Sequence, residues 1–514
     1  MTQPDPQTPR VDGPGDWHRL SAWMMLEETP GRVPQFLGVV VGLASLFLGI
    51  PGIVPIVVGA LAAVVAAVPI WLATTYQVTD QHVRVRSGVI RRKAATARRD
   101  RIRSVETTAS PLNRVLGLET VTIRTGADAS SSAVVLYCVR KQYAIALRDY
   151  LMPTGTPAAP DTADPDSPDN GQAPDVAVPL AGFEPRWLRF AAFSNLGFTV
   201  AAAALMIGAR LAYEVARPDE ERSGSWDLPS DLSISLTVSI AVAVIVFGAA
   251  ASVLSYLFEF GHFLLSRHRD GTLRIRRGLL TTTSTTLDEK RIRGIRIHEP
   301  PLMRPLRGAR LHAIATGADK QPLLLPLTPT EVVGRVGRAV FGAGGDAAQF
   351  PPQHTIPDRP GDHGALKPHP PAARRRRITR TVASALAVSV IPLIAWALGW
   401  LPLTVAITGL VVLACAGAAL GELRYRNLGH RLTDHSLVIA PPTAARQRYL
   451  LHDDGIIGWS VRASWFQRRQ GLVTLVAASA AGTEAYRIVD IHGDDASALA
   501  AEISPGLIEP FLHR

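Results

Sequence analysis

Two long stretches without a charged residue constrain this chain more than any other feature of its sequence. The first runs from Val33 to Thr79 and the second from Thr381 to Gly421, and glycine and proline interrupt each near its middle. A helix needs about 20 apolar residues, each rising 1.5 Å, to cross a bilayer. Each stretch is long enough for two crossings joined by a tight turn, so each predicts a transmembrane hairpin.

A third apolar region is less regular. Residues 190–213 and 232–256 are two apolar segments, and the residues between them, 214–231, carry six acids against two arginines, whereas the opposite ends of all three pairs are rich in arginine. Arginine-rich ends stay in the cytoplasm under the positive-inside rule. We therefore expect six spans, with both termini and every large polar segment cytosolic. The alternative is that these stretches are core helices of a large soluble protein, and their length argues against it.

Composition and motifs exclude most enzyme classes. The chain is 47% hydrophobic and only 19% charged, and its two cysteines, Cys138 and Cys415, form no metal-binding or disulfide pattern. Phosphate-binding loops, zinc-protease motifs and nucleophile elbows are absent from the sequence. Asp453 and Asp454 could hold a metal, although the repeat described next favours a structural turn. We expect no enzyme activity, cofactor, metal site or nucleic-acid partner.

The polar segments that follow the three apolar regions are copies of one another. Gly278 lies 190 positions after Gly88, and Arg291–Arg293 repeats Arg101–Arg103 at the same shift. His430–Asp434 matches Tyr76–Asp80 at a shift of 354. Constant shifts of this kind indicate three copies of one unit, a hairpin followed by a cytosolic domain. The same shifts align three sets: Arg114, Arg304 and Arg468; Pro111 and Pro301; Ser110 and Ser464.

Within a copy the pattern is that of short strands followed by one helix. Val83 and Val85 alternate with Arg84 and Arg86, which is typical of a strand with one buried face, and residues 118–124 form a further short β-rich run. Closing helices are predicted at 141–151, 329–341 and 494–503, the second from a capping box with proline at its first position. Each copy is thus expected to be a small β-barrel with a helix that plugs it.

These patterns divide the chain into nine parts. The proline-rich linkers cannot bury enough apolar surface to offset the entropy of ordering, so we expect mobile tethers, a pocket lid being the alternative. The parts are a polar N-terminal tail (1–32), a transmembrane hairpin (33–75), a first domain (76–152), a Pro/Asp-rich linker (153–186), a transmembrane pair (187–260) with an external acidic loop (214–231), a second domain (261–342), a Pro-rich linker (343–378), a third-region hairpin (379–421) and a third domain (422–514).

The sequence resembles a family of bacterial membrane proteins with PH-like domains, the YdbS/YdbT-like proteins. The resemblance rests on Thr79-Asp80, on Ser87-Gly88-Val89 and on the segment from Ser110 to Leu118, and it covers most of the chain apart from the tail and the linkers. The second copy departs at Arg269-Asp270-Gly271 and the third at Ala440-Pro441-Pro442. The resemblance implies three cytosolic PH-like domains, each a strongly bent seven-stranded barrel with a C-terminal helix, in the bacterial cytoplasmic (inner) membrane. It implies no reaction.

The candidate site is a basic cluster close behind the first hairpin. Juxtamembrane basic residues gain about 1 kcal/mol each near an anionic leaflet, so the domain could lie on the bilayer or hold a lipid head group. The alternative is that these residues only fix membrane topology, which is also our interpretation of Arg374–Arg377. The predicted anionic-surface contacts are Arg84, Arg86, Arg91, Arg92, Lys93, Arg98 and Arg99.

Two functional hypotheses remain from the sequence. The first is a membrane-anchored scaffold that binds lipid, itself or a smaller membrane protein of the same family, with envelope defence or stress tolerance as its setting by analogy. The second is a solute or peptide exporter whose cytosolic domains gate a path between the hairpins. The first and third apolar regions carry no charged residue, and in the second only Asn195 and Arg210 stand out. This favours the scaffold, because carriers usually place ionisable groups at mid-membrane.

Overall fold

The computed structural model describes residues 16–23, 68–69, 71–88, 93–102, 104–125, 134–151, 177–193, 230–269, 271–316, 321–341, 366–399, 401–433 and 436–505. It divides into two compact units. The first unit contains the first repeat and the opening strands of the second, and the second unit contains the rest of the second repeat and the third. Most of the first predicted hairpin, the first helix of the second pair and most of both linkers lie outside the described residues.

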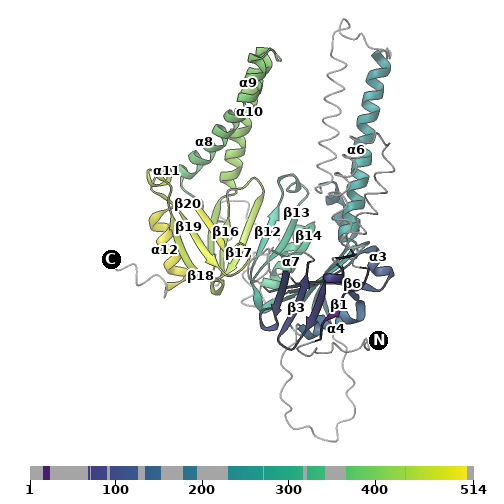
Figure 1. The fold of residues 1–514 in the computed structure, drawn as a ribbon. Coiled ribbons are helices and arrows are strands. Elements are labelled where there is room, and N and C mark those ends of the chain that lie inside the picture. The colour runs from purple at the N-terminus through teal and green to yellow at the C-terminus, as the bar shows by residue number, and fades with distance from the viewer. Residues whose placement is uncertain are drawn as a thin grey trace. The chain divides into compact units, whose positions relative to one another are not determined.

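The first repeat folds as two antiparallel sheets closed by a helix, as the PH-like expectation requires (Figure 1). Val83 and Val85 point into the core, where they meet Val121 and Ile123 of the other sheet and Leu147 of the closing helix. The predicted strand 118–124 and helix 141–151 are confirmed. The elements are β1 (His18–Arg19), β2 (Thr75–Val78), β3 (His82–Ser87), β4 (Lys93–Arg98), η1 (Arg99–Arg101), β5 (Ser104–Ala109), α3 (Pro111–Val115), β6 (Leu118–Arg124), β7 (Val134–Arg140) and α4 (Lys141–Leu151).

The second repeat contributes strands to both units. The predicted start of its closing helix at Pro329 is one residue early, because Pro329 still belongs to the last strand, where it is paired with Gly308. In the first unit the elements are β8 (Val178–Gly182), β9 (Leu264–Arg267), β10 (Thr272–Arg277), β11 (Thr282–Asp288) and η4 (Glu289–Arg291). In the second unit they are η2 (Pro185–Phe193), β12 (Ile292–Glu299), η5 (Pro301–Met303), β13 (Gly308–Ala315), β14 (Leu323–Pro329) and α7 (Thr330–Phe341). Helix α6 (Ser230–Phe260) precedes β9.

The third repeat again pairs two sheets with a closing helix. Leu437 and Leu451 from one sheet pack with Leu475 and Ile488 from the other, and Leu499 of the closing helix completes this core. The elements are β15 (Gly429–Thr433), β16 (Ser436–Ala440), β17 (Arg446–His452), η8 (Asp453–Gly455), β18 (Ile456–Arg462), α11 (Trp465–Arg468), β19 (Leu472–Ser479), β20 (Ala485–His492) and α12 (Gly493–Ile503). The pair Asp453–Asp454 forms the turn η8, as Asp100 does in η1.

Residues ahead of each apolar region add an edge strand to the domain that follows it. β1 pairs with β2, β8 pairs with β9, and Lys367 forms a single bridge to His430 of β15. The linker predictions 153–186 and 343–378 are therefore wrong in their last residues. Short extended segments can satisfy the backbone groups of an exposed edge strand even where the surrounding sequence is polar.

The start of one predicted membrane segment and the end of one predicted linker also belong to domain cores. Trp187 and Phe190 of η2 are fully buried, and Phe190 packs on Met303 and Leu327 of the second repeat. Ala373 and Arg377, in the first turns of the helix that begins at Pro371, are buried as well. The boundaries at 187 and 378 are thus misplaced, because apolar composition alone does not separate a domain's entry segment from a membrane helix.

Within the residues that the structure describes, two helices are long and apolar enough to cross a membrane: the segment Pro371–Ala397, made of α8 (Pro371–Val388) and α9 (Val390–Ala397), and α10 (Leu403–Arg426). Only 11% of the most apolar window of each is buried, so they are not core helices of the part described. Gly417 and Gly421 of α10 face α8 so closely that a Cβ on Gly421 would lie 2.6 Å from the Cα of Ile378. Small residues at this spacing let two helices pack backbone to backbone.

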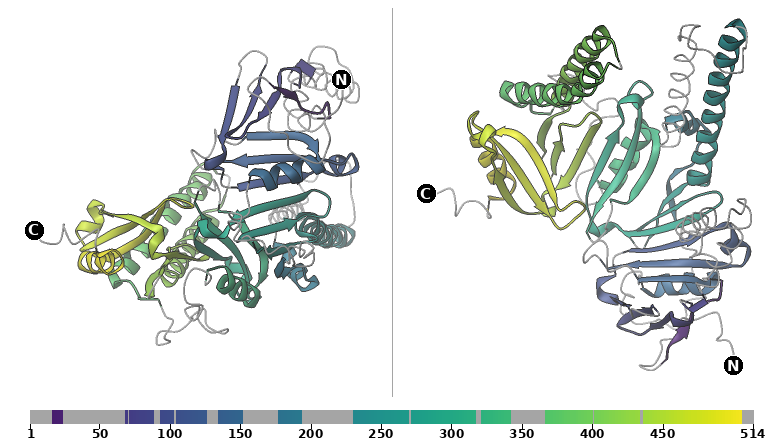
Figure 2. Two further views of the ribbon diagram at one scale, coloured as in Figure 1. Left: turned by 90° about the horizontal axis from the view of Figure 1, so that it is seen from below. Right: turned by 45° about the horizontal axis from the view of Figure 1, so that its top comes forward.

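The sheets do not stop at the repeat boundaries (Figure 2). β5 of the first repeat pairs with β11 of the second, giving one seven-stranded sheet of order β7-β6-β5-β11-β10-β9-β8. β12 of the second repeat pairs with β17 of the third, giving a six-stranded sheet of order β14-β13-β12-β17-β16-β15. Neighbouring repeats are therefore joined by backbone hydrogen bonds and not only by the chain.

Candidate functional site

Part of the predicted basic cluster lies on the outer face of the first sheet. Arg84 and Arg86 alternate with buried valines along β3, so their side chains are exposed. Arg84 lies opposite Thr96 of β4. The guanidinium carbon of Arg86 is 3.9 Å from the ring centroid of Trp17, a contact typical of a cation–π pair. These two arginines form an exposed basic pair.

The other members of the cluster are placed differently. Arg98 forms an exposed ion pair with Asp100 at 2.9 Å. Arg99 donates from Nη2 to the carbonyl oxygen of Tyr150 at 2.8 Å and lies over its ring, so it fixes the end of α4. Burial and the hydrogen bond from its hydroxyl to Asp80 raise the pKa of Tyr150. Lys93 begins β4 opposite Ser87, and Arg91 and Arg92 lie outside the described residues.

A buried ion-pair network connects α8 to the third repeat. Asp490 of β20 is fully buried and accepts hydrogen bonds from Arg376 at 2.6 Å and from Arg377. Gln467 of α11 donates to the same carboxylate from Nε2 at 2.8 Å. Two of the four arginines that we interpreted as a topology signal therefore hold the domain against the base of an apolar helix.

The position that Asp490 occupies in the third repeat has a different kind of side chain in each of the other two repeats. Asp490 and Cys138 are both two residues from the end of the third strand of their sheets, and both have a positive φ, of 62° and 51°. Cys138 contacts Asn113, the counterpart of Gln467 at the 354 shift. In the second repeat the site is apolar, with Leu327 against Phe190 and Met303 as described above. The segment that leads into the domain, η2 in the second repeat and α8 in the third, packs on this position in both repeats. Only the third repeat uses charged side chains there.

Each repeat exposes an apolar side chain at one equivalent position. Leu112, Leu302 and Phe466 coincide at shifts of 190 and 354, and they are 44%, 53% and 66% exposed. We call these three side chains the apolar tips. Ser110 and Ser464 cap the short helices that carry the first and third tips, by accepting a hydrogen bond from the backbone N–H three residues on.

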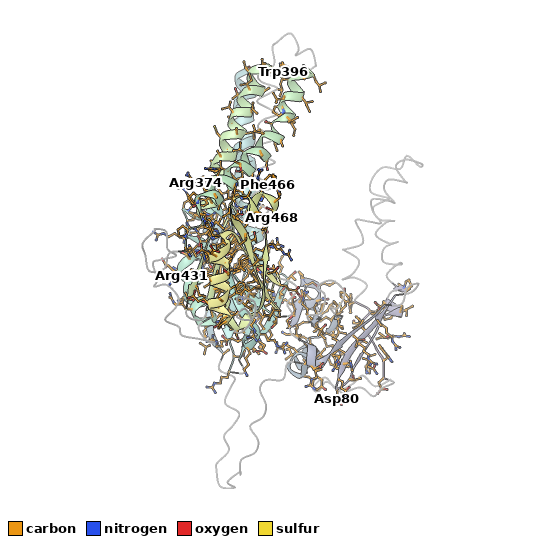
Figure 3. All side chains as sticks on the ribbon, turned by 90° about the vertical axis from the view of Figure 1, so that its left-hand side faces the viewer. Asp80, Arg374, Trp396, Arg431, Phe466 and Arg468 are labelled. Carbon is orange, nitrogen blue, oxygen red and sulfur yellow. The ribbon has the colours of Figure 1, made fainter. Side chains whose placement is uncertain are left out.

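The apolar tips lie beside the ends of apolar helices. Next to the first tip, Arg114 donates to the carbonyl oxygen of Leu279 at 3.1 Å, and the N–H of Leu279 donates to Phe258 in the last turn of α6. Next to the second, Arg304 donates to Asn427, directly after α10, at 3.0 Å. Figure 3 shows Phe466 and Arg468 at the base of the hairpin, at the opposite end from Trp396. Arg376 of α8 donates there to Ser464 at 3.3 Å.

Arg114 and Arg304 also link consecutive repeats. Both donate to a backbone carbonyl at the turn before the last strand of the next repeat's first sheet: Leu279 for Arg114, and Ala444 at 3.1 Å for Arg304. The sequence shows that these arginines repeat at constant spacing within the chain. It does not show that the carbonyl group each one contacts belongs to the following repeat.

Two junctions, β5 with β11 and β12 with β17, share one register. Val105 faces Thr286 in the first and Ile295 faces Leu450 in the second. Subtracting 190 from second-repeat numbers and 354 from third-repeat numbers converts both pairs to the numbering of the first repeat. In that numbering, each pair is position 105 facing position 96. The same strands thus meet in the same alignment twice, which indicates a built interface and not an accident of packing.

Partly buried histidines lie at the second junction, and buried histidines lie at the base of α8. His298 and His312, on β12 and β13, both have a pKa lowered to about 4, chiefly by burial. His369 and His430 lie with Nε2 and Nδ1 3.1 Å apart. Burial lowers the pKa of His430 to about 4 and also lowers the pKa of His369. All four rings are thus neutral near pH 7.

Sequence reasoning missed the Asp490 network, the Gly417–Gly421 contact and the strand junctions. A lone acid in the otherwise apolar strand end of β20 was the available signal for the first, and small residues four apart for the second. Within the part of the chain that the structure describes, no three His, Cys, Asp or Glu side chains are grouped as a metal site.

Comparisons with known proteins agree with the repeat structure. The sequence model of one family, described as Bacterial PH domain, matches residues 32–154, 190–341 and 382–506. These three matches correspond to the three repeats together with the apolar regions that precede them. Neither the curated proteins nor the solved structures contain a match to the chain.

Proposed function

Because the chain belongs to the bacterial PH domain family, with a match in each repeat, we propose that it is a non-enzymatic scaffold anchored in the bacterial cytoplasmic membrane. Its domains would face the cytosol and contact protein or lipid. The single observation that carries this proposal is the pair of shared sheets, each of which joins two neighbouring repeats by backbone hydrogen bonds.

Two exposed apolar helices support the anchor. The hairpin of α8, α9 and α10 presents apolar side chains outward and packs internally through glycine. Close contact of α8 with Gly417 and Gly421 favours an anchor over an exporter, whose hairpins would need a polar path between them. The buried Asp490 network then transmits the position of α8 directly to the third domain.

The apolar tips support a membrane-facing orientation. Leu112, Leu302 and Phe466 occupy one position in three repeats, beside the ends of apolar helices, where a side chain can enter the headgroup region. Trp465, next to Phe466, is exposed as well, and tryptophan is enriched at membrane interfaces. Arg84 and Arg86 are the exposed basic pair through which the first domain would meet anionic lipid.

Fluorescence of a probe attached at the third tip tests this proposal. The variant Phe466→Cys, in a background in which Cys415 is replaced by serine, is labelled with an environment-sensitive dye and reconstituted into vesicles. We expect a blue-shifted, brighter signal that bromine-labelled lipid quenches, and no quenching of the same dye at exposed Glu502 of α12. Equal quenching at both positions, or none at residue 466, would contradict the proposed orientation.

The basic pair is tested separately. A dye at position 96, which faces Arg84, should brighten in vesicles containing phosphatidylglycerol relative to phosphatidylcholine alone, and salt should reverse the change. Replacing Arg84 and Arg86 by glutamine should remove the difference. A signal independent of lipid charge would leave these arginines with topology as their role.

A further inference from the structure

Each strand junction joins two kinds of sheet edge, and the described strands leave one edge of each kind without a paired strand. β11 and β17, the last strands of the first sheets in repeats two and three, are both joined to the preceding repeat. Their counterpart in the first repeat is β4, which ends its sheet and pairs only with β3 among the described strands. β5 and β12 are joined to the following repeat, and their counterpart in the third is β18, which ends its sheet beside β19.

β18 has the composition of a covered strand but is exposed. Ile457 is 62% exposed and Val461 is 60% exposed. The counterparts of Val461 are Thr107 in β5 and Ile297 in β12, and both are buried where the next repeat covers them. Proteins usually protect apolar edge strands because such strands pair readily with another chain.

A glycine in β18 is explained by the same comparison. At the second junction Gly294 lies so close to β17 that a Cβ would be 2.3 Å from the carbonyl oxygen of Leu450. Its counterpart in the third repeat is Gly458, where a Cβ would meet nothing within 4 Å. Glycine weakens a strand unless another backbone approaches it, so Gly458 fits a strand that receives a partner. Ser104, at this position in β5, is also small.

The third repeated arginine is in the same situation. Arg114 and Arg304 each donate to a backbone carbonyl of the following repeat, as described above. Arg468 occupies their position, its side chain is exposed, and the described residues contain no following repeat for it to reach. Both observed junctions use an edge strand and an arginine, and the second also uses a glycine; all three features remain available at the end of the third repeat.

We propose that β18 pairs antiparallel with β4 of a second copy of this chain. The register of the two observed junctions then places Val461 opposite Ala94 and Trp459 opposite Thr96 of the other copy. The contact is heterologous, so each copy keeps one free edge and copies join head to tail. The occupant is a second copy because β4 is, among the described strands, the one that repeats the role of β11 and β17 and is not already joined at a junction.

One predicted pair opposes the association. Arg462 would face Lys93, and like charges directly opposite one another destabilise a sheet. At the two observed junctions the same positions are Thr108 facing Thr283 and His298 facing Gln447. The contact between copies is therefore expected to be weaker than the two within the chain and to strengthen when this repulsion is removed.

Disulfide trapping between separate copies tests the proposal. One chain carries Val461→Cys and a second, differently tagged chain carries Ala94→Cys, both with Cys415 replaced by serine, and the two are co-expressed in membranes. We expect a disulfide between the chains under mild oxidation, because residues directly opposite in a sheet meet the Cα separation that a disulfide needs. The intrachain pair Thr107→Cys with Ser284→Cys, the same two positions at the first junction, is the positive control.

The controls fix register and partner. Val461→Cys with Thr96→Cys, displaced by two residues on the same face, should give little product. If the separate chains give no product although the Thr107–Ser284 control is oxidised, the proposal is wrong. It is equally wrong if one chain carrying both Val461→Cys and Ala94→Cys forms only an intrachain bond, because β4 and β18 of the same copy would then be partners.

Variants with opposite effects on association complete the test. Gly458→Val and Arg468→Ala should each lower the oligomer fraction measured by mass photometry, whereas Arg462→Glu should raise it several-fold. Val115→Lys changes an exposed apolar residue away from both edges and should leave the fraction unchanged. The proposal is contradicted if the oligomer fraction stays unchanged in all three of the variants Gly458→Val, Arg468→Ala and Arg462→Glu. The inference goes beyond the proposed function, since its result does not depend on dye quenching at the tips or on lipid charge.

Discussion

Replacing Asp490 by asparagine removes the charge that two arginines share inside the third repeat. The carboxylate is fully buried, and Arg376 and Arg377 are both largely withdrawn from solvent. Asparagine keeps the size of the side chain and tolerates the positive φ of this position, so the change acts mainly on charge. Removing one partner of a buried ion pair costs about 3–5 kcal/mol, because the other partner is left charged and unpaired.

This cost should appear as faster local opening of the third repeat. Since each 1.4 kcal/mol is roughly a factor of ten, a loss of about 3 kcal/mol raises the open population at least a hundredfold. Hydrogen exchange followed by mass spectrometry on peptides from β20, in the full chain in micelles, measures this directly. Glu422→Gln breaks the more exposed pair with Arg374, so it should change the exchange of these peptides much less than Asp490→Asn does.

A second substitution separates charge from packing. Adding Arg377→Met to Asp490→Asn removes one of the stranded charges and moves the site toward the apolar solution of the second repeat, where Met303 and Leu327 meet Phe190. The double variant should therefore be more stable than the sum of the two single effects predicts. Strict additivity, or a threefold or smaller effect of Asp490→Asn alone, would refute the reasoning.

Three further predictions concern the hairpin, the histidine pair and the second junction. Gly421→Val should lower the thermal stability of the hairpin, because its Cβ would meet α8 backbone, whereas Gly409→Val, with nothing closer than 3.9 Å, should have little effect. His430 is neutral when folded, so its contribution to stability is complete above its unfolded pKa near 6.5 and is lost as pH falls toward 4. The protection factors of the β15 amides, which correct for slower intrinsic exchange at lower pH, should therefore fall between pH 7 and 5, and less so in His430→Gln. Arg304→Ala should speed exchange at the start of β17, by about tenfold for the loss of charged hydrogen bonds, while exposed Arg335→Ala should not.

The sequence predicts the repeated elements well because they follow local rules. Constant shifts of 190 and 354 identified three domains, and alternation and helical periodicity placed β6 and α4 correctly. Chain entry into each domain was harder to predict. The strand β8 and the helix η2 lie in a linker and at the start of an apolar region, where composition indicates neither a strand nor a domain core.

The contacts between repeats could not be predicted from pattern, because pattern describes which face of a strand is buried and not what lies at its edge. β12 and β18 both begin with isoleucine and have glycine at their third position, yet β12 is covered by β17 and β18 ends its sheet. Arg114 and Arg304 were visible as a repeated arginine, while the carbonyl groups that receive their hydrogen bonds belong to backbone, which carries no sequence signal. The Asp490 network likewise joins residues more than a hundred positions apart.

The central claim, that three equivalent modules are joined by two strand pairings in one register, is tested most directly by an electron cryomicroscopy map of the full chain in lipid nanodiscs. The account predicts β5 beside β11 with Val105 opposite Thr286, and β12 beside β17 with Ile295 opposite Leu450. Separate domains without these pairings, or a register that differs between the two junctions, would contradict it.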